Sequence, residues 1–428
     1  MKQTTFSDES IDMIEWISKN NTSKCIPTQK WNEKTSNVIA QLFNDIVQAN
    51  EYVQKQKREK KKFYNVDIRN ITHSNQTPKP KTFNMNSITT EIKSYIETES
   101  SGYLLYKTKL NGKHFKVNFV VNSIDPFSHV SIFNKYFERM VTWMHIANKY
   151  ASNKCGKDLT VFVYLTPFKK YLPNTHVEII GQEHANTAFT YTCPNTTSEI
   201  VIYREEEWFK VFIHESFHNL SLDFSCLEIK NLCSNIMKTV FPIQSDFLLF
   251  EAYTEVWSVI INTSMCVYFC FDDTNNIDIF TQTLKFLLAF ECLFKIFQMN
   301  KILRFMGLDY SLLYSNSNES KSARDMLYKE NTNIFAYHVA TTIILCNYPT
   351  FLEWCYTNNM HYMLFKKTNT NVENFCMFII KKYNSEYTLK AINNVDGKKG
   401  CYDKMLKNGE KFQINIDKTM RMTLCEML

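Results

Sequence analysis

The sequence predicts an α+β protein in which a small mixed sheet lobe precedes an α-helical lobe. Two segments within 102–121, GYLLYKTKL and KHFKVNFVV, flank the dipeptide Asn111-Gly112, and apolar and polar residues alternate in the second segment. This pattern is typical of a β-hairpin. In the later half, no glycine occurs between residues 181 and 307 and no proline between 242 and 349, while apolar residues recur at helical spacing. That half is therefore expected to be helical.

Further segments of the sheet lobe can be assigned from their patterns. The stretch at 129–150 has the apolar spacing of a helix, and DLTVFVYLTP at 158–167 has the composition of a buried strand. Two short strands are expected at 186–193 and 198–204, on either side of a turn. The predicted strands thus all come before the motif HESFH at 214–218.

The chain divides into five predicted regions. The linker is inferred because its residues lose apolar periodicity and include two prolines. The regions are a helical N-terminal extension (1–65), the linker (66–87), the sheet lobe ending in the helix that carries HESFH (88–225), the α-helical lobe (226–349) and a small α/β or irregular C-terminal region (350–428).

Composition is that of a globular protein. The chain has 428 residues, of which 44% are hydrophobic, and its formal net charge of +6 comes from 49 basic and 43 acidic residues. This excess is too small to imply a nucleic-acid partner. The basic run QKQKREKKKF at 54–63 is typical of a solvated helix face, and no motif that reads nucleic acid accompanies it. We therefore do not expect nucleic acid as a partner.

Cysteine usage and apolar runs bear on location. The 13 cysteines are scattered without a CxxC pair, which favours free thiols in a reducing compartment. Acidic residues interrupt the N-terminal segment where a signal peptide needs an apolar core. The longest apolar run, 256–271, is too short to span a bilayer and is expected to be a buried helix. These features predict a cytoplasmic protein with no membrane span.

The motif HESFH predicts a metal site. Three glutamates at 205–207 precede the segment, as suits the start of a helix. On a helix, His214 and His218 project from one face and can bind one zinc ion, while Glu215 lies beside a water molecule in the fourth position. Such a string arises by chance in about one chain of this kind in a hundred. A third ligand is needed to support the prediction.

Two patterns could supply that ligand. In the first pattern, the third ligand follows the second histidine at a short fixed offset. Phe224 stands at that position here, and Asp223 lies one residue before it, so this pattern is disfavoured. The segment LLFEAYTEVWSVI at 248–260 instead places Glu251 and Glu255 on one face of an apolar helix. Two carboxylates in such a setting are costly unless they are paired or bind a metal. The alternative is that both are paired acids on a helix surface.

HESFH followed by FEAYTE resembles the gluzincin branch of the zincin metallopeptidases, over about residues 100–350. The resemblance implies a zincin-like α+β fold, with Glu251 as the third zinc ligand. It also implies that Glu255 holds the far ring nitrogen of a ligand histidine. NTAFT at 186–190 is similar to the edge strand that pairs with the peptide substrate in this family.

The resemblance implies a mechanism of peptide hydrolysis. Glu215 would accept a proton as water attacks the peptide carbonyl and would pass it to the leaving amine. Tyr337 or His338 could stabilise the oxyanion, although a core tyrosine and a core histidine are equally good interpretations. His184 and Asp223 are further candidates for acid/base or supporting roles.

Taken together, these features predict a zinc-dependent metallopeptidase that acts on a peptide or protein substrate. The alternative is a non-catalytic binding or structural protein on the same scaffold, against which the presence of Glu215 argues. The abundance of Asn, Lys, Ile and Phe, with few glycines, resembles proteins of large DNA viruses or of other AT-rich organisms. A viral source would extend the expected location to the host cytoplasm or the virion.

Overall fold

A computed structural model describes most of the chain. The described residues are 5–19, 30–59, 63–85, 88–122, 124–195, 197–272, 275–396, 401–409 and 415–428. The predicted N-terminal extension, the basic run and the C-terminal region each fall partly outside these ranges. The chain forms two compact units. We call residues 41–169 and 186–226 the sheet unit, and residues 1–40, 170–185 and 227–428 the helical unit.

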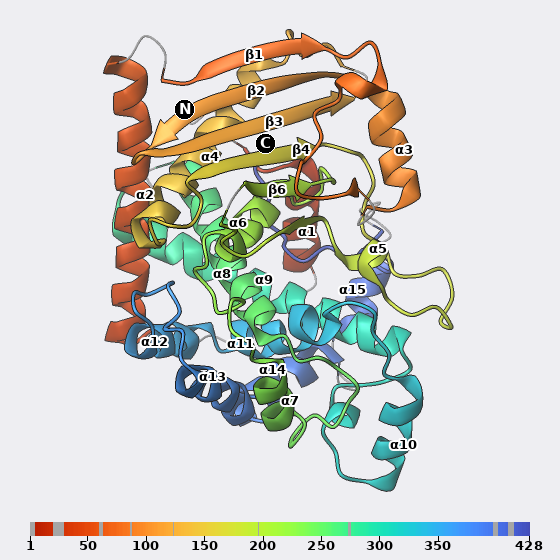
Figure 1. The fold of residues 1–428 in the computed structure, drawn as a ribbon. Helices are drawn as coiled ribbons and strands as arrows, with labels where there is room; N and C mark the ends of the chain where they lie inside the picture. Colours follow the sequence, from red (N-terminus) through yellow and green to blue (C-terminus); the bar gives the residue numbers. More distant parts are fainter. Residues whose placement is uncertain are drawn as a thin grey trace. The chain divides into compact units, whose positions relative to one another are not determined.

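The sheet unit contains one six-stranded mixed sheet, which confirms the predicted α+β class. Its strand order is β1-β2-β3-β4-β6-β5, so β1 and β5 are the two edges (Figure 1). The β1–β2, β2–β3 and β5–β6 pairs are antiparallel, and the β3–β4 and β4–β6 pairs are parallel. The strands are β1 (Asn65–Asn70), β2 (Ser100–Leu110), β3 (Lys113–Asn122), β4 (Asp158–Tyr164), β5 (Ala188–Thr190) and β6 (Ser198–Ile202).

The predicted hairpin is confirmed, and part of the predicted linker is wrong. Asn111 and Gly112 have φ angles of 49° and 82° between β2 and β3, as a two-residue hairpin turn requires. Residues 65–70, which were assigned to the end of the N-terminal extension and to the linker, form strand β1 along β2. The pattern was missed because an edge strand with little burial lacks apolar alternation.

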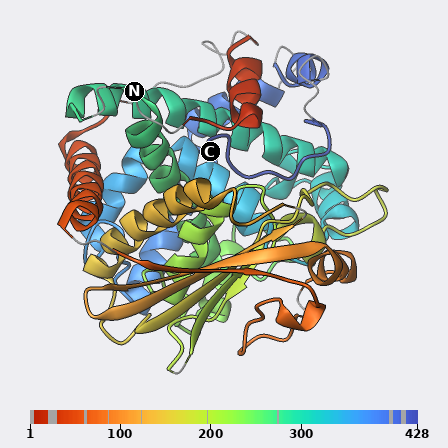
Figure 2. The same ribbon diagram turned by 90° about the horizontal axis from the view of Figure 1, so that it is seen from above.

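Helices cover both faces of the sheet (Figure 2). The helix predicted at 129–150 is α4 (Val130–Tyr150), and its Phe137 ring stacks on Tyr106 of β2 and Phe115 of β3. On the other face lies α3 (Thr90–Glu99), whose Ile92 and Ile96 pack in one cluster with apolar side chains of β3, β4 and β6. Burial of these faces fixes which side chains of each strand point inward.

One disulfide corrects the expectation of free thiols. Cys155, just before β4, is bonded to Cys193, in the connection between β5 and β6. Sequence spacing gave no hint of this pair, because the two residues are 38 positions apart and only the fold brings them together. Ten other cysteines in the described part of the chain are not disulfide-bonded there, and eight of them are buried.

The helical unit confirms the predicted helical half and extends it to the C-terminal region. Residues 350–428, expected to be a small α/β or irregular region, contain helices that belong to this unit. Its helices are α1 (Asp8–Lys19), the start of α2 (Glu33–Glu59), α5 (Gln182–Ala185), α7 (Lys230–Met237), α8 (Leu249–Cys270), α9 (Ile277–Phe305), α10 (Asn318–Leu327), α11 (Thr341–Cys346), α12 (Tyr348–Asn358), α13 (Asn369–Lys382), α14 (Glu386–Asp396) and α15 (Tyr402–Gly409).

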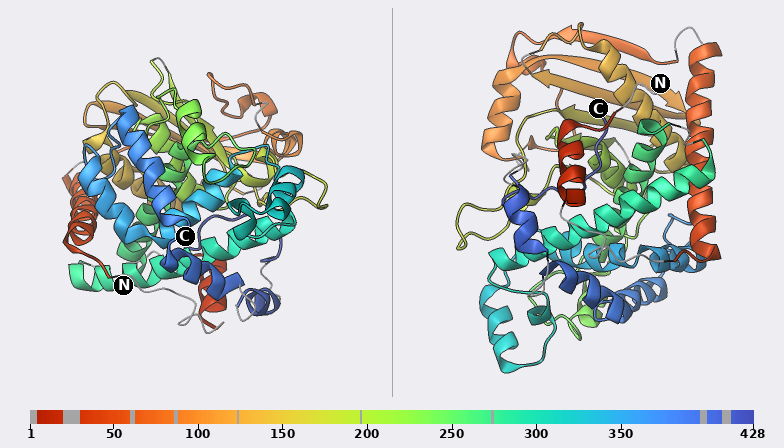
Figure 3. Two further views of the ribbon diagram at one scale, coloured as in Figure 1. Left: turned by 90° about the horizontal axis from the view of Figure 1, so that it is seen from below. Right: turned by 180° about the vertical axis from the view of Figure 1, so that it is seen from behind.

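The apolar run at 256–271 forms most of α8, which is buried along nearly its whole length, as expected. Helix α1 is part of the same core. Its Trp16 is fully buried, packs edge-to-face on Phe297 of α9 and donates a hydrogen bond from Nε1 to the Met405 carbonyl at 2.6 Å. Figure 3 shows α1, in red, beside α9. In the described residues, no helix is long and apolar enough to cross a membrane.

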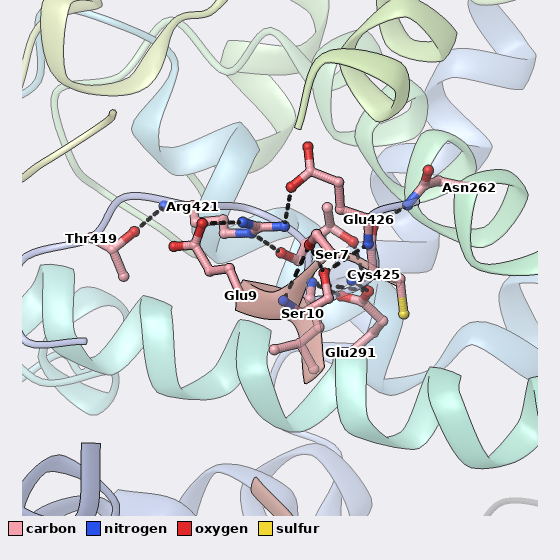
Figure 4. A network of polar contacts seen from close by, with 11 residues as sticks. Ser7, Glu9, Ser10, Asn262, Glu291, Thr419, Arg421, Cys425 and Glu426 are labelled. Atoms are coloured by element: carbon pink, nitrogen blue, oxygen red, sulfur yellow. Dashed lines mark hydrogen bonds and ion pairs between the residues drawn. The ribbon is translucent and has the colours of Figure 1, made fainter. Parts of the chain in front are cut away.

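A polar network joins the two ends of the described chain to α9 (Figure 4). The buried Glu291 carboxylate accepts hydrogen bonds from the backbone N–H groups of Leu424 and Cys425, at 3.0 and 3.1 Å. Arg421 pairs with Glu9 of α1 at 3.1 Å and with Glu426 at 2.9 Å. These charge-assisted contacts satisfy backbone donors in the interior, so residues 415–428 are an integral part of the helical unit.

Candidate metal centre

The motif HESFH lies on a buried helix of the sheet unit, as predicted. Helix α6 (Trp208–Asn219) is buried on all sides. Its start is marked by Glu207, whose φ of 60° places it in the left-handed region outside the helix. Inside the helix, the hydroxyl of Ser216 accepts a 2.6 Å hydrogen bond from the Trp143 indole of α4. Buried contacts on every side therefore fix the rotation of α6 and the directions of its side chains.

The two histidines converge at metal-ligand spacing. Nε2 of His214 lies 3.1 Å from Nε2 of His218, one turn further along the helix. Two nitrogens bound about 2.0–2.1 Å from one tetrahedral ion lie roughly 3.3 Å apart. The exposed fractions of the two residues are 7% and 8%, so each has limited access to solvent. The pair is therefore already close to the geometry of two ligands of one ion.

Asp223 fixes the tautomer of His218. Its Oδ2 lies 2.5 Å from Nδ1 of His218, and its Oδ1 accepts hydrogen bonds from the backbone N–H and hydroxyl of Ser225 at 3.2 and 2.8 Å. A carboxylate can only accept here, so Nδ1 carries the proton and Nε2 of His218 presents its lone pair toward His214. Metal-binding histidines are oriented in this manner by carboxylates.

Glu215 lies between the two histidines in sequence and about 100° around the helix from His214. Its exposed fraction is 9%, which makes it a nearly buried carboxylate in a helix that carries two convergent imidazoles. A carboxylate in such surroundings is retained at a cost in desolvation. Glu215 therefore stays a candidate for a general base.

Asn219, which sequence reasoning did not single out, ties the end of α6 to the sheet edge. Its carbonyl accepts the N–H of Cys193 at 3.0 Å, and its side chain donates to the Thr190 hydroxyl of β5 at 3.0 Å. It also accepts from the Ser198 hydroxyl of β6 at 2.7 Å. The sequence did contain a signal for these contacts, namely an asparagine directly after the second histidine of an apolar helix. A buried amide needs several hydrogen-bond partners, which here come from the sheet edge.

The two carboxylates of FEAYTE lie on α8 of the helical unit, in different surroundings. Glu251, in the first turn, is partly buried and accepts from the Asn333 amide at 3.4 Å. Glu255 is buried and forms an ion pair with the buried Lys295 of α9 at 2.8 Å. The alternative of paired surface acids is therefore wrong for Glu255. Asp223 lies on the far ring nitrogen of His218, and the role of Glu255 beside a ligand histidine stays a prediction of the family resemblance.

The remaining candidates are also in the helical unit. Tyr337 and His338 lie in a π-helical turn, Phe335–Ala340, and Tyr337 is partly buried. His338 is fully buried, and within the described structure neither of its ring nitrogens has a hydrogen-bond partner. Burial, and then the charge of Lys295, lowers the pKa of His338 well below its ordinary value. His184, in α5, accepts the N–H of Gly181 at its Nδ1 at 3.0 Å.

His214 and His218 of the sheet unit and Glu251 of the helical unit each offer a ligand atom that a metal ion could use. Two imidazoles and one carboxylate match the ligands that catalytic zinc prefers, although such sites also bind other divalent ions. Comparison of the chain with protein-family models, with curated proteins and with solved structures gives no match. Its function is therefore argued from the residues of the site alone.

Proposed function

We propose that this protein is a zinc-dependent metallopeptidase. The observation that carries the proposal is the arrangement on α6, where two histidine nitrogens lie 3.1 Å apart and Asp223 holds the far ring nitrogen of one of them. Two histidines that only pack in a core do not need a carboxylate that directs the lone pair of one ring toward the other ring. A metal site does need such an arrangement.

In this proposal, Glu251 of α8 is the third protein ligand. It lies in the first turn of α8 and is partly exposed, whereas Glu255, one turn later, forms an ion pair with Lys295. Three protein ligands leave one position open, as in catalytic rather than structural zinc sites. A zinc ion held there acts as a Lewis acid and lowers the pKa of a bound water toward neutrality.

Glu215 is the proposed general base. Its carboxylate accepts the proton of the attacking water and delivers it to the amine that leaves. The buried surroundings of α6 exclude bulk water and strengthen this proton transfer. Of the two oxyanion candidates, the partly buried Tyr337 is the better choice, because His338 is fully buried within the helical unit.

The sheet edge suggests how a peptide substrate is held. In the described structure, β5 pairs with β6 on one side and ends the sheet on the other. Such an edge can hydrogen-bond the backbone of an extended peptide. Asn219, the residue directly after His218, donates a hydrogen bond to Thr190 of β5. This contact fixes the position of the sheet edge relative to the two histidines. We propose that β5 is the substrate-binding strand.

Metal analysis of the purified protein tests the ligand set. We expect one zinc per chain in the wild type, loss of zinc in the His214→Ala/His218→Ala double variant, and weakened binding in Glu251→Ala. Glu319→Ala is a matched control, because Glu319 is also an acid in the first turn of a helix of this unit. Full zinc occupancy in the double variant would exclude the proposed site.

A further inference from the structure

A second site lies at the other edge of the sheet unit, where β1 begins. A cavity of about 320 Å³ opens there between the end of α2 and the turn between β2 and β3. This volume is at the lower end of the range for small-molecule sites, about 300–1,000 Å³. Its lining is mixed, cationic and aromatic: Gln56, Phe63, Tyr64, Asn65, Lys107, Thr108, Lys109 and His114.

Three cationic or potentially cationic side chains gather on one face of the hairpin. Lys107 and Lys109 are two residues apart on β2, so both project from the same face, and His114 of β3 is paired directly with Lys109. None of the three forms an ion pair in the part of the chain that the structure describes. Lys116, next on that face, is instead neutralised by Asp158 at 2.9 Å. Among the described residues that line the cavity there are two lysines and a histidine but no acidic residue.

The opposite wall supplies aromatic rings and an unused acceptor. The Tyr64 hydroxyl donates to Glu138 at 3.1 Å, which holds the Tyr64 ring. The Phe63 carbonyl accepts from the Thr108 hydroxyl at 3.1 Å, which holds the backbone of Phe63. Oε1 of Gln56 is buried and has no hydrogen-bond partner within the described residues. Such an atom favours a ligand that donates a hydrogen bond to it.

We propose that this cavity binds a nucleoside monophosphate. The phosphate would lie against Lys107, Lys109 and His114, since cationic side chains are strong partners for phosphate oxygens. The base would contact the rings of Phe63 and Tyr64, and an amino or hydroxyl group of the ligand would donate to Oε1 of Gln56. A phosphate alone would leave the aromatic wall and Gln56 unused. This inference is independent of the proposed peptidase activity.

The test is a calorimetric titration of the full chain with AMP, with inorganic phosphate and with a short single-stranded oligonucleotide. We expect saturable binding of AMP that is at least about tenfold tighter than that of phosphate. Lys107→Gln/Lys109→Gln should weaken AMP binding by about tenfold or more, because it removes two charge-assisted contacts. Lys116→Gln is the matched control, since this lysine shares the face but not the cavity, and it should bind AMP as the wild type does.

A second variant separates the two ends of the ligand. Gln56→Leu should weaken AMP binding and leave phosphate binding unchanged, because only the nucleoside reaches this residue in the proposed arrangement. The proposal is overturned if AMP does not bind, if Lys107→Gln/Lys109→Gln binds it as the wild type does, or if phosphate binds as tightly as AMP. Tighter binding of the oligonucleotide than of AMP would also overturn it, in favour of a nucleic-acid surface.

Discussion

Asp223 and His218 form a buried pair in which the carboxylate oxygen Oδ2 lies 2.5 Å from the ring nitrogen Nδ1. The opposite nitrogen of the same ring lies 3.1 Å from His214. The carboxylate thus sets the proton on one side of the imidazole and leaves a lone pair on the other. Since Asp223 follows His218 by five residues, the tight turn after α6 brings the candidate metal ligand and its carboxylate partner together from one short segment.

Replacement of Asp223 by asparagine should weaken metal binding. The amide keeps the size of the side chain but loses the charge that makes the His218 nitrogen a better ligand. We expect zinc affinity to fall by roughly 10–100-fold, as for other residues that support metal ligands. Competition with a chromophoric chelator measures this change. Asp158→Asn, at an exposed ion pair in the same unit, is the control. Equal affinity in both variants would show that Asp223 does not support a metal ligand.

Removal of the disulfide should destabilise the sheet unit. Cys155 and Cys193 are 38 positions apart in the sequence. A cross-link of that span lowers the entropy of the unfolded chain, which raises the free energy of unfolding by roughly 3–4 kcal/mol. The Cys155→Ser/Cys193→Ser variant should therefore unfold at lower denaturant concentration, as followed by tryptophan fluorescence. Cys226→Ser is the control, because Cys226 is exposed and free. An unchanged midpoint in the double variant would mean that the bond contributes nothing to stability.

The buried His338 should make the helical unit less stable in acid. Its pKa is lowered by burial and by Lys295, Lys170 and Lys301, while Glu255 acts in the opposite direction. The unfolded chain therefore takes up a proton first as the pH falls. The stability that depends on neutral His338 is fully present above pH about 6.5 and is lost progressively below it, by up to about 1.4 kcal/mol per pH unit.

Denaturant unfolding of the wild type and of His338→Leu between pH 7.5 and 5 tests this expectation. The variant should lose the part of the pH dependence that His338 causes. His361→Leu controls for removal of a histidine, because His361 is exposed in the same unit. If wild type and His338→Leu lose stability in parallel as the pH falls, His338 is not the group responsible.

Local patterns predicted several elements well, because short-range physics determines them. The hairpin at Asn111-Gly112 follows from a turn that needs positive φ, and α4 and α8 follow from apolar spacing. The histidine pair was also predictable, since four residues make one helical turn and His214 and His218 then share a face.

Features that depend on distant pairings could not be predicted. Strand β1 is held by hydrogen bonds to β2 rather than by burial, so its sequence has no clear pattern. The bond between Cys155 and Cys193 depends on how the sheet brings two connections together. Asp223 was among the candidates for a supporting role, but its contact with Nδ1 of His218 depends on the turn after α6, which residue spacing alone does not determine.

Turnover of a broad peptide library by the wild type and by Glu215→Gln, both loaded with zinc, tests the central claim most directly. Glutamine keeps the size of the side chain but cannot accept the proton, so the variant should bind zinc as the wild type does and lose about 10²-fold or more in turnover. Glu228→Gln, at a residue of the helical unit outside the proposed site, should cleave at the wild-type rate. Equal turnover by the wild type and Glu215→Gln would contradict the proposed mechanism, and no cleavage by zinc-loaded wild type would favour a non-catalytic scaffold.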